Sequence, residues 1–112
     1  MSNYYELTID QGSTFAITVE LKDYFTNDPL DLNGYTARSQ IRKDYNSTTS
    51  NSFTVSVQDA SNGNISMSMT ASNTANLKAG RYVYDLEIEE TATTEVTRVL
   101  QGVAIVTPQV TR

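Results

Sequence analysis

The side chains of this 112-residue sequence that could do acid–base chemistry are mainly carboxylates. Glu87, Glu89, Glu90 and Glu95 surround one predicted hairpin. A glycoside hydrolase needs two carboxylates that face each other across a cleft, one of them in a setting that raises its pKa. Carboxylates that alternate along a solvated strand have no such setting. We therefore expect them to keep the sheet soluble or to form an electrostatic contact surface.

Neither histidine nor cysteine occurs in the sequence. The commonest general base, the commonest zinc ligand and every thiolate nucleophile are therefore missing. Serine and threonine are abundant, but none has an activating base beside it in the sequence pattern. We expect no enzymatic activity, no catalytic residue and no cofactor.

Three aspartates, Asp23, Asp28 and Asp31, cluster in one predicted connection. Calcium is held by several carboxylate and carbonyl oxygens, but this spacing does not match a calcium-binding loop. Aspartate is also a common turn former, because its side chain bonds to nearby backbone N–H groups. We interpret the three residues as turn formers and expect no metal site.

Seven tyrosines and no tryptophan leave two readings of the aromatic residues. Flat aromatic rings can stack on sugars, and tyrosine is also enriched at protein interfaces. The candidates for either role are Tyr4, Tyr24 and Tyr45, which fall in separate segments. Protein contacts are the favoured reading and glycan binding the alternative. The remaining tyrosines are expected on core faces: Tyr5, Tyr35, Tyr82 and Tyr84.

The net charge of −5 and the pI near 4.5 argue against nucleic acid, because tracking phosphates needs positive charge on one face. The segment from Met1 to Asp10 lacks the features of a secretory leader. The longest strongly apolar run, Val103 to Val106, is too short to cross a bilayer. We expect no membrane insertion and a protein made in the cytoplasm.

Apolar residues alternate with period 2 in segment after segment, which indicates strands that are buried on one face. The predicted fold is all-β, an immunoglobulin-like antiparallel sandwich of two sheets and about seven strands, in a single domain spanning residues 1–112. The predicted strands are centred on residues 5–9, 15–21, 35–41, 53–57, 65–69, 82–88 and 99–105. The predicted core comprises Leu7, Ile9, Phe15, Ile17, Val19, Ile41, Phe53, Val55, Val57, Ile65, Met67, Tyr82, Tyr84, Leu86, Val99, Val103 and Ile105.

Turn residues mark the connections between these strands. The stretch 23–34 is predicted to anchor on the core through Leu30 and Leu32, and the polar stretch 44–52 to be an exposed loop. The pair Asn62-Gly63 predicts a hairpin. Residues 72–77 predict a short helical turn, which Ser72 or Asn73 would cap and Gly80 would close.

The last two predicted strands form a hairpin around a loop at residues 91–94. This register places Leu86 opposite Val99 and Glu87 opposite Arg98. Gly102 predicts a bulge in the last strand. Tyr82 stands where a tyrosine corner has its tyrosine, although it could also be an ordinary half-buried strand residue.

Several segments together resemble a small β-sandwich family of tailed-bacteriophage virion proteins. They are Tyr5–Phe15, Leu30–Arg42, Ala79–Leu86 and Val96–Gly102, and the resemblance spans nearly the whole chain. It implies a structural component assembled in the host cytoplasm into the virion, without catalysis. Tail, baseplate, neck and capsid surface (decoration) remain open as its place in the particle.

This resemblance implies that the partners are other virion proteins, and copies of the chain itself are a further option. We expect the contacts on the segment Met1–Tyr5, the loop Asp44–Ser52 and the tail Thr107–Arg112, where extended segments can add to a neighbour's sheet edge. The acidic strand around Glu87 and Glu89 is the alternative contact surface. The predicted partner-binding residues are Tyr4, Tyr5, Tyr45, Asn46, Glu87, Glu89, Gln109 and Arg112.

Overall fold

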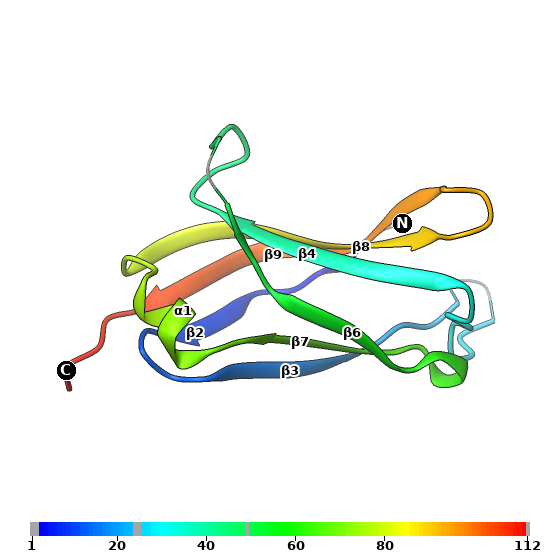
Figure 1. The fold of residues 1–112 in the computed structure, drawn as a ribbon, viewed down its shortest axis with the longest axis horizontal. Coiled ribbons are helices and arrows are strands. Elements are labelled where there is room, and N and C mark those ends of the chain that lie inside the picture. Colours follow the sequence, from blue (N-terminus) through cyan, green and yellow to red (C-terminus); the bar gives the residue numbers. More distant parts are fainter. Residues whose placement is uncertain (1–2, 24–25, 49, 112) are drawn as a thin grey trace.

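Two β-sheets pack face to face in the computed structural model, which describes residues 3–23, 26–48 and 50–111 (Figure 1). The larger sheet contains β1 (Asn3–Tyr4), β2 (Leu7–Asp10), β4 (Tyr35–Arg42), β5 (Asn51–Ser52), β8 (Gly80–Glu90) and β9 (Val96–Thr107). The smaller sheet contains β3 (Phe15–Glu20), β6 (Thr54–Asp59) and β7 (Asn64–Met69). A 3-10 turn, η1 (Ala60–Asn62), and a short helix, α1 (Ala71–Ala75), lie in connections.

The predicted all-β, immunoglobulin-like sandwich is confirmed. The larger sheet has the order β1-β9-β8-β4-β5 with β2 also on β9, and the smaller sheet has the order β3-β7-β6. The expectation of purely antiparallel pairing is wrong at one place, because β1 and β2 run parallel to β9, with Leu7 opposite Ala104. After β2 the chain crosses to the other sheet, so β2 is not part of a hairpin and is free to pair in parallel. In the described ranges, no helix has the length and apolar character needed to span a membrane.

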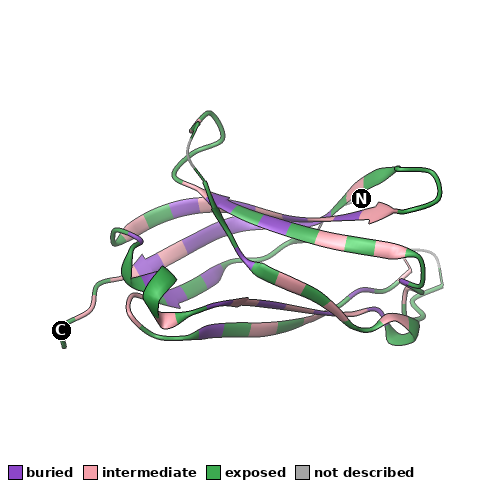
Figure 2. Cartoon of the chain, in the orientation of Figure 1, coloured by how far each residue is buried: buried purple, intermediate pink, exposed green. Residues whose placement is uncertain are grey.

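The core lies between the two sheets, where buried residues alternate with exposed ones along the strands (Figure 2). Most of the predicted core is buried, including Ile9, Ile41 and Leu86, which have no exposed surface. Leu32 is buried and Leu30 packs against the core, as predicted for the 23–34 connection. Seven more residues are buried that the predicted core list does not include, although Leu21, Met69 and Ile88 belong to the apolar faces of predicted strands. They are Leu21, Met69, Leu77, Ile88, Leu100, Ala104 and Val106.

The predicted register of the last hairpin is half right. Glu87 does lie opposite Arg98, but Leu86 lies opposite Leu100, so Val99 is an extra residue in β9. Such a bulge places two residues of one strand against one of its partner. Both Val99 and Leu100 are accordingly in the core.

The bulge also reverses the predicted faces of the rest of β9. A shift of one residue moves every following side chain to the other face of a strand. Ala104 and Val106 are therefore in the core, while the predicted core residue Ile105 is only half-buried. Val103 is buried but lies outside the main core cluster.

Gly102 is not the bulge that the sequence predicts, because it pairs in register with Tyr84. The reason for a glycine here is the backbone of Tyr5, which crosses directly over it. A Cβ atom at position 102 would lie 2.1 Å from the carbonyl oxygen of Tyr5. That oxygen also accepts a hydrogen bond of 2.6 Å from the Tyr84 hydroxyl, and the Tyr5 N–H donates to the Gln101 carbonyl at 2.9 Å.

Three further connections refine the predictions. The Asn62-Gly63 hairpin is confirmed, with η1 leading into Gly63 in the left-handed conformation. The stretch 44–52 is not loop throughout, because its last two residues form β5 on the edge of β4. Thr70 caps α1 through its side-chain oxygen, in place of Ser72 or Asn73, and Gly80 begins β8 rather than closing the helical turn.

The predicted tyrosine corner is confirmed. The Tyr82 hydroxyl donates to the carbonyl oxygen of Lys78 at 2.8 Å, which ties the start of β8 to the connection before it. The Nζ of Lys43 lies 4.8 Å from the centre of the Tyr82 ring, a distance at which the ammonium group is attracted to the face of the ring.

Replacing Tyr82 by phenylalanine removes this hydrogen bond and keeps the ring in place. We expect the free energy of unfolding to fall by about 1 to 3 kcal/mol, because a partly buried carbonyl loses its donor. Urea denaturation would measure the change, with Tyr45→Phe, on an exposed ring, as the matched control. Equal stability of the two variants would contradict the role of the corner.

Candidate interaction surfaces

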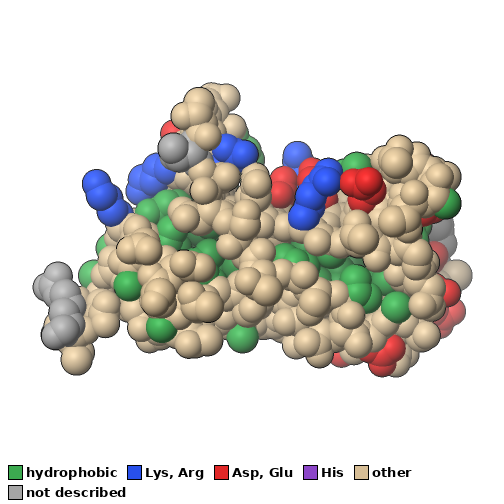
Figure 3. All heavy atoms as spheres, in the orientation of Figure 1, with side chains coloured by type: hydrophobic (Ala, Val, Ile, Leu, Met, Phe, Trp, Pro, Cys, Tyr) green, Lys and Arg blue, Asp and Glu red, His purple; other side chains and the backbone are tan. Residues whose placement is uncertain are grey.

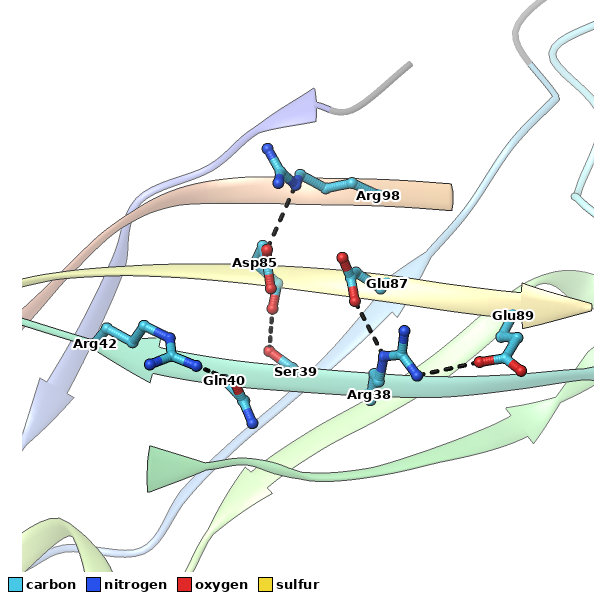
Figure 4. A network of polar contacts seen from close by, with 8 residues as sticks. All are labelled: Arg38, Ser39, Gln40, Arg42, Asp85, Glu87, Glu89 and Arg98. Carbon is cyan, nitrogen blue, oxygen red and sulfur yellow. Dashed lines mark hydrogen bonds and ion pairs between the residues drawn. The ribbon is translucent and has the colours of Figure 1, made fainter. Parts of the chain in front are cut away.

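The outer face of the larger sheet carries a network of charged side chains from β4, β8 and β9 (Figure 4). The Arg38 guanidinium contacts Glu87 at 3.0 Å and Glu89 at 3.1 Å, and Arg98 lies 3.4 Å from Asp85. The pKa of Arg38 is raised, and the hydrogen bond to Glu87 is the largest cause of the rise. The arginines are at least half exposed and the carboxylates are partly exposed, so these pairs order the surface more than they stabilise the fold. Glu87 thus lies opposite Arg98 but pairs with Arg38.

Beside this network lies a polar depression of about 260 Å³. Burial, followed by the charge of Glu87, raises the pKa of Asp85 within it, while Arg98 opposes the rise. A hydrogen-bond donor on Asp85 would therefore favour its charged form. Tyr45, with 74% of its surface exposed, stands at this depression. The depression is lined by Gln40, Arg42, Tyr45, Val83, Tyr84, Asp85, Glu87, Arg98 and Gln101.

A short turn holds Tyr45 in this place. The Arg42 guanidinium donates to the Ser47 carbonyl at 2.8 Å, and the Asn46 N–H donates to the Asp44 carboxylate at 2.9 Å. Asn46 is exposed and forms part of the turn that carries Tyr45. The structure therefore brings the predicted residues Tyr45, Asn46 and Glu87 to one surface.

Tyr4 and Tyr5 belong to a different surface. The prediction of Tyr5 on the core face is wrong, because 57% of its surface is exposed, as is 66% of that of Tyr4. Tyr5 lies between β1 and β2, where its backbone is fixed over Gly102 and its side chain turns outward. Both rings border an apolar groove of about 470 Å³, which is also lined by Ile17, Thr18, Val19, Glu20, Leu21, Val99 and Leu100.

The C-terminal tail is less free than the sequence analysis expects. The Gln109 N–H donates to the Gln11 side chain at 3.0 Å, and the other end of that side chain donates to the Leu77 carbonyl at 2.7 Å. Gln109 is half-buried and its side chain packs where a Cβ of Gly12 would stand. Only beyond Gln109 does the tail become open, with 91% of Val110 exposed. The predicted contact residue Arg112 lies outside the described residues, as does Tyr24.

The charged side chains are unevenly distributed along the molecule. In Figure 3, Lys and Arg gather toward one end of the visible face and Asp and Glu toward the other. The Tyr35 hydroxyl donates to Glu90 at 3.2 Å. This bond, then burial, then the charges of Glu90, Glu95 and Asp31 raise the pKa of Tyr35.

Two of the three predicted turn formers in the 23–34 connection, Asp23 and Asp31, bond to nearby backbone through their side chains. Asp28 takes part in the turn through its backbone carbonyl, which accepts the Asp23 N–H at 2.8 Å. The Asp23 carboxylate accepts the Thr26 N–H at 3.2 Å, and the Asp31 carboxylate accepts the Asn33 N–H at 3.0 Å. Within the part of the chain that the structure describes, no group of three or more acidic residues is arranged to hold a metal ion.

Comparisons with known proteins inform the fold alone. No family model and no curated protein matches the sequence. Among solved structures, the chain is similar to Listeria monocytogenes InlP, with 22% identity and a TM-score of 0.52 over 95% of this chain. The chain spans only 28% of that InlP chain. It also aligns with the NK cell receptor NKp44, at 12% identity and a TM-score of 0.48, over 96% of this chain and 99% of that one.

The groove walls formed by Ile17, Val19 and Leu21 were not predicted, because the alternating pattern assigns the first two to a closed core. Asp85 and Arg98 were not predicted as parts of the polar depression either. Their alternation with core residues places both on the solvent face, but only the fold shows that they lie beside Tyr45.

Proposed function

We propose that this chain is a non-enzymatic structural protein of a bacteriophage virion, which binds another virion protein through the groove beside Tyr4 and Tyr5. The observation that carries the proposal is this aromatic pair, exposed at the mouth of an apolar groove. Exposed apolar surface of this kind is typical of protein–protein contacts, where tyrosine is enriched.

The chemistry of the remaining surfaces supports a binding role over a catalytic one. The sequence has no histidine or cysteine. Glu87 and Glu89 are paired with Arg38, and Asp85 lies beside Arg98. A general acid or base needs a pKa near the working pH and a place beside a substrate cleft. Paired carboxylates on an open sheet face are better suited to electrostatic contact with a partner.

The resemblance of four segments to virion proteins gives the proposal its biological setting. The proposal covers the tail, baseplate, neck and capsid surface equally, with assembly in the host cytoplasm. Because the rings of Tyr4 and Tyr5 lie on the surface, the proposal can be tested by surface substitutions.

The double substitution Tyr4→Ser and Tyr5→Ser should leave the free energy of unfolding nearly unchanged, because both rings are largely exposed. Incorporation into particles should fall about tenfold or more, as expected for the loss of aromatic contacts at an interface. Quantitative mass spectrometry of purified particles from a complementation assay would measure it. Tyr45→Ser is the control. Normal incorporation of the double variant would refute the proposal.

Glycan binding is the second candidate, and one observation favours it. Tyr45 offers an exposed ring beside a depression lined by carboxylate, amide and guanidinium groups, which can bond to sugar hydroxyls. A glycan array with the wild type and Tyr45→Ala would test it. Saturable binding that is lost in Tyr45→Ala, but kept in the Tyr4/Tyr5 double variant, would favour attachment to a surface sugar.

A further inference from the structure

Strand β3 leaves one of its edges open. In the described residues it pairs only with β7, because β1 and β2, which precede it in the chain, pair with β9 in the other sheet. An open edge presents a row of backbone donors and acceptors to any extended chain that approaches. The six residues of β3 are thus able to accept a further strand.

The register shows which backbone groups point to the open edge. The Leu21 N–H donates to the Gly63 carbonyl at 2.8 Å, on the β7 side. In an antiparallel pair, alternate residues direct both backbone groups to the same neighbour. The odd-numbered residues of β3 therefore face β7, and Ala16, Thr18 and Glu20 direct their N–H and C=O groups outward. In the described part of the chain, no hydrogen bond reaches these outward groups.

The apolar groove runs beside this edge. Phe15 and Leu21, at the two ends of the β3 segment, are buried. Between them Ile17 and Val19 pack against the core but are only half-buried. The middle of β3 therefore lacks apolar cover on the side of the groove, where an added strand would place alternate side chains.

The charge of the groove limits what can bind there. Among the described residues that line it, Glu20 is the only charged one, and the whole chain carries a net charge of −5. A strand with a lysine or arginine next to Glu20 is attracted, whereas a second copy of this chain carries the same net negative charge.

We infer that β3 accepts an extended strand of a partner polypeptide, which has aliphatic side chains at alternate positions and a lysine or arginine beside Glu20. The partner strand extends the β3-β7-β6 sheet and covers Ile17 and Val19. This inference rests on the proposed function, since it names how a partner occupies the groove beside Tyr4 and Tyr5. Main-chain bonds supply affinity and alternate side chains supply selectivity.

The probe is a capped synthetic peptide, Thr-Val-Lys-Val-Thr-Val-Thr, with its Glu-for-Lys form and a scrambled form as controls. Amide hydrogen exchange of the full chain, followed by NMR, should slow at Ala16, Thr18 and Glu20 when the Lys peptide is added. Simple hydrophobic adsorption in the groove leaves these three amides unprotected. Unchanged exchange at saturating peptide would overturn the inference.

Two substitutions test the geometry separately from the proposed function. Thr18→Pro removes one outward N–H and should weaken the Lys peptide about tenfold, while Thr18→Val should stay within about twofold. Glu20→Lys should reverse the preference in favour of the Glu peptide. Equal binding by wild type and Glu20→Lys would contradict the charge assignment. If Thr18→Pro does not fold, the exchange measurement on the wild type decides alone.

Sedimentation of the wild type without peptide tests whether a second copy of the chain occupies the β3 edge instead. A monomer is the result expected if β3 binds a strand of another protein. A dimer that Thr18→Pro converts to a monomer would show that a second copy occupies the β3 edge, and would overturn the inference. If the Tyr4/Tyr5 variant assembles normally but the peptide still protects the three amides, the proposed function fails and the strand-binding edge stands. If the variant fails to assemble and the amides stay unprotected, the function stands and the binding mode is wrong.

Discussion

Replacing Gly102 by alanine is expected to lower the free energy of unfolding by about 3 kcal/mol or more. The added Cβ would lie 2.1 Å from the Tyr5 carbonyl oxygen and 2.9 Å from its carbonyl carbon. Backbone atoms cannot move aside like the end of a flexible side chain. The Tyr5 segment must therefore leave β9, and it takes with it the hydrogen bonds to Gln101 and Tyr84.

Gly34→Ala is the matched control for Gly102→Ala. Gly34 has a φ of +85° but no atom within 4 Å of an added Cβ, so its substitution costs backbone strain alone, about 1 to 2 kcal/mol. Urea denaturation compares the two variants, and hydrogen exchange should quicken at the Tyr5 amide only in Gly102→Ala. A smaller loss at Gly102 than at Gly34 would show that β1 and β2 are not held as described.

The second large effect is expected for Leu86→Ala, which should cost about 2 to 5 kcal/mol. Leu86 has no exposed surface and lies opposite Leu100 at the centre of the larger sheet. Its truncation leaves a cavity that the two packed sheets cannot easily close. The loss would be measured by urea or thermal unfolding.

Ile105→Ala is the comparison that tests the bulge in β9. Ile105 is half-buried and stands outside the core cluster, so its truncation should cost clearly less than that of Leu86. A loss at Ile105 equal to that at Leu86 would mean that the face of β9 beyond Val99 had been assigned the wrong way round.

Most of the sandwich can be predicted from the sequence because burial on one face imposes a period of two. That pattern locates every long strand, and the loop, hairpin and tyrosine-corner signals follow from local turn chemistry. The same pattern cannot find the extra residue at Val99. Because Val99, Leu100 and Val103 are all apolar, either set of alternate residues in β9 is compatible with a buried face. The bulge predicted at Gly102 was wrong for a related reason, because the pattern does not show why a glycine is needed there. The glycine is needed for the contact with Tyr5, nearly a whole chain length away.

The interaction surfaces are less predictable than the fold. The solvent face of Arg38, Glu87 and Glu89 follows from alternation, but the neighbour that pairs with Glu87 depends on strand order. The groove depends on which sheet the first strands join. Because β1 and β2 join β9, Tyr5 is exposed and the edge of β3 is open, and local sequence contains no signal for that choice.

The parallel pairing of β2 with β9 also determines when the larger sheet can be completed. Leu7 pairs with Ala104, so this contact closes a loop of almost the whole chain, whereas the β6–β7 and β8–β9 hairpins close short ones. Longer closures cost more entropy and slow folding. During synthesis, the backbone of β2 therefore has no strand partner until β9 has been made, and the apolar side chains of Leu7 and Ile9 are exposed to aggregation for that interval.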